Sequence, residues 1–158
     1  ESRNLREKFA INGIKQFITD ETYLFYFHTK GVTRVDEKFH QWRKILNLYT
    51  LKEWKLNIQY LKKYDAVGCY LSRYPALHFS GNFWWSRVSY IKKLPRCGDS
   101  YLAPEMWVGS RNEGHNFISL TNKNDNGVEN HLPPIKPDIR KDVTTDVINN
   151  EACKHFRY

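Results

Sequence analysis

A histidine and a lysine stand two residues apart at the end of an apolar run and are followed by a glycine. These residues are His28, Lys30 and Gly31, and the run before them is residues 23–27. A lysine ammonium is a compact positive charge that binds anions, and a glycine allows close approach of the backbone to a ligand. The spacing is not that of a P-loop. We interpret the segment as a candidate anion site, with a polar strand end and a hydrogen-bonded histidine as the alternative.

A second candidate segment, residues 78–85, combines aromatic side chains with small polar ones. A tryptophan face stacks on the apolar face of a sugar, while serine and asparagine hydrogen-bond to hydroxyl groups. Loop-forming residues inside so apolar a run favour a binding site over the alternative, a wall of the hydrophobic core. The candidate sugar-binding or acceptor-binding residues are His78, Ser80, Gly81, Asn82, Trp84 and Trp85.

The third candidate is the carboxylate of Glu105, which follows Pro104 and precedes Trp107 by two residues. A carboxylate beside a tryptophan can have a raised pKa and act as a general base. Alternatively, Glu105 is an ordinary glutamate in a first helical turn, where the helix dipole favours it. The motifs HExxH, GxSxG and GxGxxG are absent, so protease, lipase and dinucleotide-oxidoreductase functions lose their usual support.

Helices and strands that would position these residues alternate along the chain, which is typical of the α/β class. Residues 23–27 predict a strand buried on both faces, in a parallel or mixed sheet. Thr50 followed by Glu53 resembles a capping box that opens a helix. The expected helices are residues 5–18, with Phe9 and Phe17 on the apolar side, the stretch after Asp36, residues 51–63, residues 86–94 and a short helix at Pro104. The other expected strands are residues 65–70 and 117–120.

The composition indicates one soluble domain with a basic surface. The chain has 158 residues and a net charge of +8, and residues 123–158 contain as many acidic as basic side chains. Such a distribution favours an anionic partner, although solubility alone is the alternative. No apolar run reaches the roughly 18 residues that span a bilayer, and no signal peptide is evident. We expect a domain over residues 1–121 and an extended tail over residues 122–158.

Three cysteines do not form a disulfide framework. Cys69 lies in an apolar run and is expected in the core. Cys97 and Cys153 could pair in an oxidising compartment, but their spacing does not show such a pair. A zinc site from these two cysteines and His155 matches no common ligand spacing.

The order of the motifs resembles a poorly characterised group of glycosyltransferase-like proteins from bacteria and large viruses that are associated with surface glycans. The resemblance runs from Tyr23 to Trp107. Its motifs are Tyr-Leu-Phe-Tyr-Phe-His-Thr-Lys-Gly, Trp-Arg at residues 42–43, Tyr-Asp-Ala-Val-Gly, His-Phe-Ser-Gly-Asn-Phe-Trp-Trp and Pro-Glu-Met-Trp. It implies a GT-A-like mixed sheet flanked by helices, a nucleotide-sugar donor and a glycan or glycoconjugate acceptor.

The same resemblance assigns roles to the candidate residues. His28 and Lys30 would face the donor diphosphate, residues 80–82 would shape the sugar or acceptor pocket, and Glu105 would be the base of an inverting enzyme. A divalent cation, Mn²⁺ or Mg²⁺, often holds the diphosphate in that class, but this chain has no Asp-x-Asp. GT-A domains usually begin further upstream, so residues 1–121 would be the C-terminal part of such a domain.

Two other function classes remain as alternatives. A non-catalytic carbohydrate-binding or interaction module would use Trp84, Trp85 and Trp107 as a stacking platform. A nucleic-acid-binding protein is disfavoured, because the cations are scattered among helices and no recognition motif is present. We expect a cytoplasmic protein with a peripheral membrane contact as a further option. A lumenal location would follow if Cys97 and Cys153 were paired.

Overall fold

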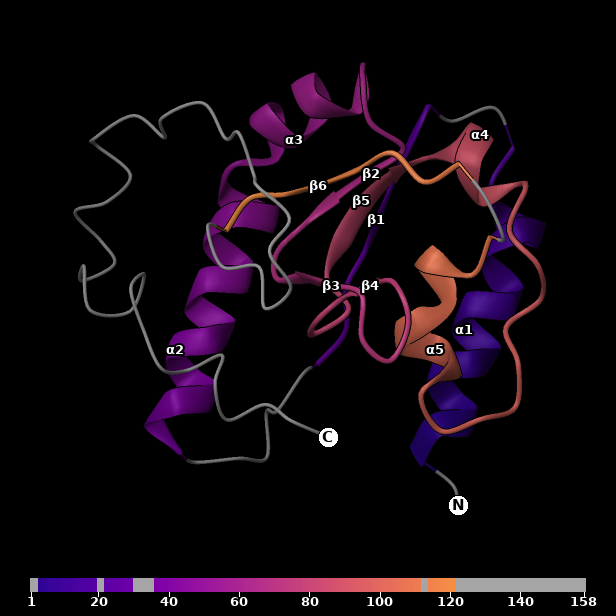
Figure 1. Cartoon of the computed structure of the whole chain (residues 1–158), viewed down its shortest axis with the longest axis horizontal. Helices are drawn as coiled ribbons and strands as arrows, with labels where there is room; N and C mark the ends of the chain where they lie inside the picture. Colours follow the sequence, from indigo (N-terminus) through magenta and orange to yellow (C-terminus); the bar gives the residue numbers. More distant parts are fainter. Residues whose placement is uncertain (1–2, 20–21, 30–35, 112–113, 122–158) are drawn as a thin grey trace.

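The computed structural model describes residues 3–19, 22–29, 36–111 and 114–121. They form a mixed α/β fold with a four-stranded sheet in the order β1-β5-β2-β6 (Figure 1). Strand β5 pairs antiparallel with β1 and β2, while β2 pairs parallel with β6. A mixed sheet flanked by helices was expected from the sequence, and this coarse architecture is confirmed. The predicted tail over residues 122–158 lies outside the described residues.

The elements have the following bounds. The strands are β1 Tyr23–Tyr26, β2 Ala66–Gly68, β3 Leu71–Ser72, β4 His78–Phe79, β5 Trp84–Arg87 and β6 Phe117–Ser119. The helices are α1 Arg3–Phe17, α2 Glu37–Leu46, the π-helix η1 Asn47–Lys52, α3 Trp54–Leu61, α4 Val88–Ile91, α5 Ala103–Met106 and the 3-10 helix η2 Trp107–Gly109. Strands β3 and β4 form a separate antiparallel pair.

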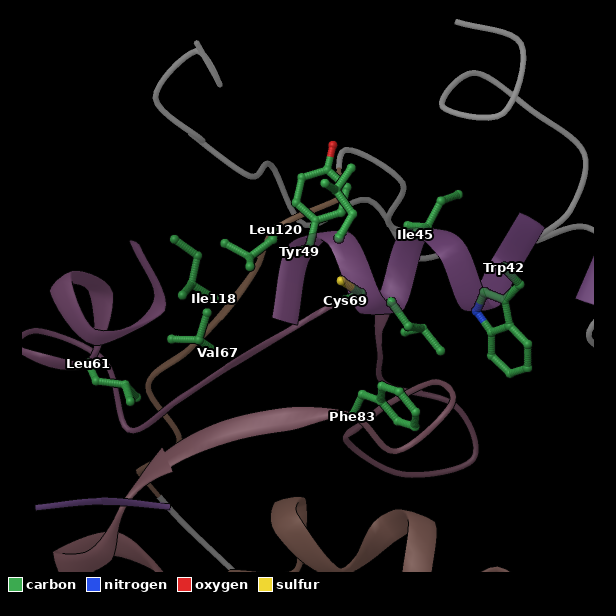
Figure 2. Packing of buried hydrophobic residues seen from close by; sticks show 11 residues of the cluster. Trp42, Ile45, Tyr49, Leu61, Val67, Cys69, Phe83, Ile118 and Leu120 are labelled. Atoms are coloured by element: carbon green, nitrogen blue, oxygen red, sulfur yellow. The ribbon is translucent and has the colours of Figure 1, made fainter. Parts of the chain in front are cut away.

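Two hydrophobic clusters pack against opposite faces of the sheet, because neighbouring residues of a strand point to opposite faces. Val67 belongs to the cluster under α2, η1 and α3 (Figure 2), whereas Ala66 belongs to the cluster that contains residues of α1, α4 and η2. In Figure 1 the first group of helices lies to the left of and above the sheet, and α1, α4 and α5 lie to its right. The sheet is thus covered by helices on both faces.

Strand β1 differs from its expected place. It occupies an edge of the described sheet, and three of its four residues are partly exposed, so it is not a strand buried on both faces. Aromatic contacts accompany the backbone pairing of β1 with β5. Phe25 stacks on Trp85 and Tyr26 stacks on Trp84, at ring-centroid distances of 4.7 and 5.0 Å. Such pairs add to the stability of neighbouring strands.

The helix starts are partly as expected. Asp36 caps α2, with its side chain accepting a hydrogen bond from the Lys38 N–H at 2.9 Å. The capping box predicted at Thr50 is wrong. Thr50 lies inside η1, fully buried, and its hydroxyl donates to the Leu46 carbonyl at 2.7 Å. The predicted helix over residues 86–94 shortens to α4, because its first two residues complete β5.

Both described cysteines, Cys69 and Cys97, are buried. Burial raises the pKa of the Cys97 thiol. A pair of Cys97 with Cys153 would involve a residue outside the described range. Within the described part of the chain, no helix has the length and apolar character needed to cross a membrane.

Candidate functional site

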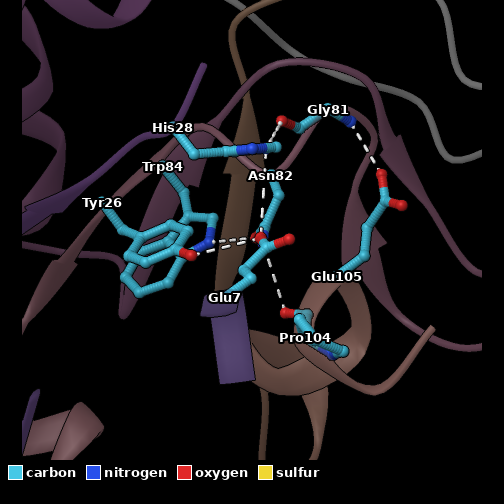
Figure 3. Close-up of polar contacts among 8 residues, drawn as sticks. All are labelled: Glu7, Tyr26, His28, Gly81, Asn82, Trp84, Pro104 and Glu105. Atoms are coloured by element: carbon cyan, nitrogen blue, oxygen red, sulfur yellow. Dashed lines mark hydrogen bonds and ion pairs between the residues drawn. The ribbon is translucent and has the colours of Figure 1, made fainter. Parts of the chain in front are cut away.

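The loop between β4 and β5 is fixed by a network of polar contacts that joins distant parts of the sequence (Figure 3). The network comprises Glu7 of α1, Tyr26 and His28 at the end of β1, Gly81 and Asn82 of the loop, Trp84 of β5, and Pro104 and Glu105 of α5. Four residues singled out from the sequence, His28, Gly81, Asn82 and Glu105, therefore come together. They are separated in sequence by up to 77 residues, and only the fold unites them.

Asn82 is the centre of the network. It is 1% exposed and has a positive φ of 56°, which asparagine tolerates better than most residues. Its Oδ1 accepts from Trp84 Nε1 at 2.7 Å, and its Nδ2 donates to Glu7 Oε1 at 2.6 Å and to the Pro104 carbonyl at 3.3 Å. Buried polar groups are stable only when paired in this way. Asn82 thus joins three elements and does not face solvent.

Gly81 is clamped on both of its backbone polar groups. Its N–H donates to Glu105 Oε1 at 2.9 Å, and its carbonyl accepts from His28 Nε2 at 3.1 Å. A carbonyl can only accept, so Nε2 of His28 carries the proton. Gly81 has a φ of 93°, and a Cβ there would lie 2.8 Å from the Trp42 ring. Only glycine fits this position without strain.

Glu7 was not identified from the sequence. Its Oε1 accepts from Tyr26 Oη at 3.1 Å as well as from Asn82, and it lies 4.0 Å from His28 Nε2. Burial, followed by the adjacent Glu7 carboxylate, raises the pKa of Tyr26. The apolar spacing of α1 carries no signal for a polar contact from the same helix. It also does not mark the buried side reliably, because Phe9 and Phe17, expected on that side, are exposed.

A pocket of about 390 Å³ opens beside this network, at the end of β1. Arg43 and Lys44 of α2 give it a basic character, and His28 and His40 line it as well. Arg43 Nη2 donates to His40 Nδ1 at 2.6 Å. The lining residues are Phe27, His28, Thr29, His40, Arg43, Lys44, Asn47, Leu51 and Phe83, and none of these is acidic. The pocket thus combines positive charge with two phenylalanine rings.

Several sequence-based expectations about a shared cleft are corrected by this geometry. Asn82, Trp84, Trp85 and Glu105 are not among the residues that line the pocket beside His28. Glu105 is 8% exposed and is turned toward the Gly81 N–H. The interior here is filled by the side chains of Trp84 and Trp85 and by the buried hydrogen bonds of Asn82 and Glu105. These four residues therefore support the loop from inside the fold.

The tryptophans of the motif have structural partners. Trp84 is fully buried, as expected for one of the pair, and Trp107 is 2% exposed, so neither offers a free face for a sugar. Trp85 is partly buried between Phe25 and η1, where its Nε1 donates to the Thr50 carbonyl at 2.7 Å. A stacking platform built from Trp84, Trp85 and Trp107 is therefore wrong.

His78 lies in β4, and Ser80 is the first residue of the loop between β4 and β5. His78 is 2% exposed, with Nδ1 2.8 Å from the Ala76 carbonyl and Nε2 3.3 Å from the Ser80 hydroxyl. The burial of His78 agrees with the alternative for residues 78–85, a wall of the hydrophobic core. Lys30 and Gly31 of the predicted anion site lie outside the described residues. Among the residues that the structure describes, no group of three or more His, Cys, Asp or Glu side chains is placed to hold a metal ion.

Fold and site together define an α/β protein with a buried polar clamp on one loop and a basic, aromatic pocket next to it. A family comparison matches residues 3–99 to a domain of unknown function, DUF8361. The match covers more than half of the chain, so the protein belongs to this family. It includes Glu7, His28, Arg43 and Asn82 and ends before Glu105. Comparisons with curated proteins and with solved structures found no match.

Proposed function

We propose that this DUF8361 protein is a nucleotide-sugar-dependent glycosyltransferase that moves a sugar to a glycan or glycoconjugate acceptor. The observation that carries the proposal is the pocket at the end of β1, in which basic side chains and aromatic rings lie together. A nucleoside diphosphate sugar has matching parts, namely two phosphates, an aromatic base and hydroxyl groups. The resemblance of the motifs to glycosyltransferase-like proteins with a GT-A-like sheet supports the same class.

Each lining group has a role in this proposal. Arg43 and Lys44 provide charge for the diphosphate, and such positioned cations stabilise the charge that develops on a leaving diphosphate. Phe27 and Phe83 provide ring faces or edges for the base. The Asn47 amide can donate to and accept from hydroxyl groups. The pocket volume is within the range of small-molecule sites, which is roughly 300–1,000 Å³.

His28 connects the pocket to the clamped loop. It lines the pocket and also donates to the Gly81 carbonyl, so a ligand that contacts His28 would affect the loop that Asn82 holds in place. In this proposal the motif around residues 80–82 acts mainly by fixing the wall of the donor site. Lys30 and Gly31 follow His28 in sequence and remain proposed donor-binding residues.

Ligand binding is the first test of the proposal. At a concentration 100 times its dissociation constant, a bound donor stabilises the folded state by about 2.7 kcal/mol. Thermal shift and calorimetry with uridine and guanosine diphosphate sugars are expected to show such binding, with Arg43→Gln weakening it. Arg73→Gln is the matched control, because Arg73 is exposed on the β3–β4 hairpin and does not line the pocket. Absence of binding to every donor would contradict the proposal.

The role of Glu105 separates the transferase from the second candidate, a non-catalytic carbohydrate-binding module. The observation that favours this second candidate is that the Glu105 carboxylate is buried and holds the Gly81 N–H. A general base contributes roughly 10²–10⁴ to turnover. A loss of that size in Glu105→Gln, with donor binding kept, would establish the base predicted from the sequence. Sugar binding without any release of nucleoside diphosphate would favour the module.

A further inference from the structure

Two exposed apolar side chains line the pocket, and a third follows one of them closely in the chain. Phe27 is 57% exposed, Leu51 41% and Trp54 48%. Phe27 and Leu51 line the pocket together, and Trp54 follows Leu51 by three residues at the start of α3. Large apolar side chains scattered singly on a surface are ordinary, but a group of them indicates an interaction site. We call Phe27, Leu51 and Trp54 the apolar rim.

Helix η1 explains why Leu51 points outward. This π-helix buries three consecutive residues, Leu48, Tyr49 and Thr50, and the next two residues are exposed. The wider π turn thus turns Leu51 and Lys52 toward solvent, just before Trp54. π-helical turns are rare and often occur at functional sites. The turn that exposes Leu51 therefore supports a functional role for the apolar rim.

Lysines adjoin the residues of the apolar rim, because Lys44 also lines the pocket and Lys52 and Lys55 follow Leu51 and Trp54 directly in the chain. Lys44, Lys52 and Lys55 are exposed, and Lys55 Nζ lies 5.7 Å from the centre of the Trp54 ring. Residues 38–64 contain seven lysines and arginines and one acidic residue, Glu53. The rim therefore lies in a strongly basic part of the surface. Such a surface favours an anionic partner over a neutral or a cationic one.

We propose that the apolar rim and its lysines dock the protein on an anionic lipid bilayer surface. Tryptophan side chains favour the interface between headgroups and acyl chains, where the ring is apolar and its N–H remains hydrated. Exposed apolar groups and basic charge are the two signals that together give stable peripheral binding. The docking itself does not depend on the chemistry in the pocket.

The geometry also bears on the acceptor, and this step rests on the proposed function. Leu51 and Phe27 belong to both the rim and the pocket. A protein docked through this rim would hold its pocket at the membrane surface. A donor in the pocket would then lie next to an acceptor carried by a lipid.

The experiment measures partitioning of the full chain onto vesicles. Vesicles of phosphatidylcholine alone are compared with vesicles of equal parts phosphatidylcholine and phosphatidylglycerol, by sedimentation and by tryptophan emission. Trp54 is the most exposed of the five tryptophans, all of which are described. Binding is therefore expected to shift the emission to the blue, on anionic vesicles only, and to weaken as salt increases.

Two variants and a control locate the surface. A lysine near an anionic membrane contributes about 5-fold to partitioning, so Lys52→Gln/Lys55→Gln is expected to weaken it about 25-fold. Trp54→Ser is expected to weaken it about 10-fold and to abolish the blue shift. The control Lys93→Gln/Arg96→Gln removes the same charge at two exposed positions after α4 and is expected to bind within a small factor of wild type. Circular dichroism checks that each variant is folded.

Several outcomes would overturn the proposal. These are no binding to anionic vesicles, equal binding to both vesicle types, or an equal loss in the control and in Lys52→Gln/Lys55→Gln. Donor binding is measured separately, without vesicles. Vesicle binding without donor binding would leave the docking surface intact and contradict the proposed function, whereas the reverse would contradict the docking alone.

Discussion

One asparagine carries more of the local structure than its side-chain size suggests. Asn82 accepts from Trp84 and donates to Glu7 and to the Pro104 carbonyl, while its own backbone takes a positive φ. Each partner belongs to a different element, so the loop between β4 and β5 is positioned by hydrogen bonds as well as by packing. The loop in turn presents the Gly81 carbonyl to His28.

This arrangement predicts how substitutions at Asn82 rank. Asn82→Ala leaves the buried Trp84 N–H without its acceptor, which costs about 1–3 kcal/mol, and places alanine in the left-handed region, which costs about 1–2 kcal/mol. Asn82→Gly removes the backbone cost but not the lost hydrogen bonds, so it should be the less destabilising of the two. Urea unfolding followed by circular dichroism measures both. Gln59→Ala, at an exposed position of α3, is the control and should stay within about 0.5 kcal/mol.

At the residue scale, the sequence identified several residues of the polar network but did not predict their structural roles. His28 was singled out at the end of an apolar run, Gly81 and Asn82 as loop-forming residues within one, and Glu105 from its neighbours. The fold brings these four residues together. Their hydrogen-bond partners are as far as 75 residues away, and spacing in one chain carries no information on such pairings. Glu7 was missed for the same reason.

The pocket shows the same limit for a different kind of contact. Arg43 was noted in a motif but not as a binding residue, and His40 and Lys44 were not singled out. Their convergence with Phe83 depends on how α2 lies against the loop before β5, which is a tertiary contact. Apolar periodicity fixes the buried face of α2 and leaves its exposed face undetermined.

The helices and strands begin where local sequence signals predict them when burial does not offer the same residue another hydrogen bond. The cap at Asp36, the proline in the first turn of α5 and the strand β6 lie where the sequence predicts them. The capping box at Thr50 failed because a buried threonine in a helix can instead bond to the carbonyl four residues earlier. The sequence pattern is the same in both cases, and burial decides between them.

Helix α1 provides an element-scale prediction, since its apolar residues do not share one environment. Ile11 is fully buried, whereas Phe17 is 80% exposed although the spacing predicted it on the apolar side. Ile11→Ala is expected to cost about 2–5 kcal/mol. Phe17→Ser is expected to change the free energy of unfolding by less than about 0.5 kcal/mol. Urea unfolding of the two variants measures the difference, and a large loss for Phe17→Ser would show that its side chain is covered in solution.

For the molecule as a whole, the sheet divides the described chain into two packed layers with different tasks. The layer under α2, η1 and α3 carries the pocket and the apolar rim on its outer surface. The layer that includes α1, α4 and η2 carries Glu7 and Tyr26 and so holds the loop from the other side. The pocket and the apolar rim thus lie on the α2 side of the sheet, although Phe9 and Phe17 of α1 are also exposed on the other side.

The stability of the fold at alkaline pH depends on two tyrosines, Tyr26 of the network and Tyr90 outside it. Burial raises the pKa of Tyr26 and of Tyr90, and Tyr90 Oη donates to the Val108 carbonyl at 2.8 Å. In the unfolded chain both phenols ionise near pH 10, while in the folded chain they stay protonated. The folded state then binds more protons than the unfolded state, so stability is complete below pH 10 and falls above it.

The slope gives the measurement. Each such tyrosine lowers the free energy of unfolding by about 1.4 kcal/mol per pH unit once the unfolded phenol is ionised. Tyr90→Phe loses the contacts of the Tyr90 hydroxyl with the Val108 carbonyl and with His115 Nδ1 at neutral pH. It should nevertheless show a shallower decline between pH 10.5 and 12, by about that amount. Tyr74→Phe is the matched control, because the Tyr74 side chain is 80% exposed in the folded chain, and it should keep the wild-type slope. Equal slopes for Tyr90→Phe and wild type would mean that the Tyr90 phenol ionises in the folded protein as readily as in the unfolded one.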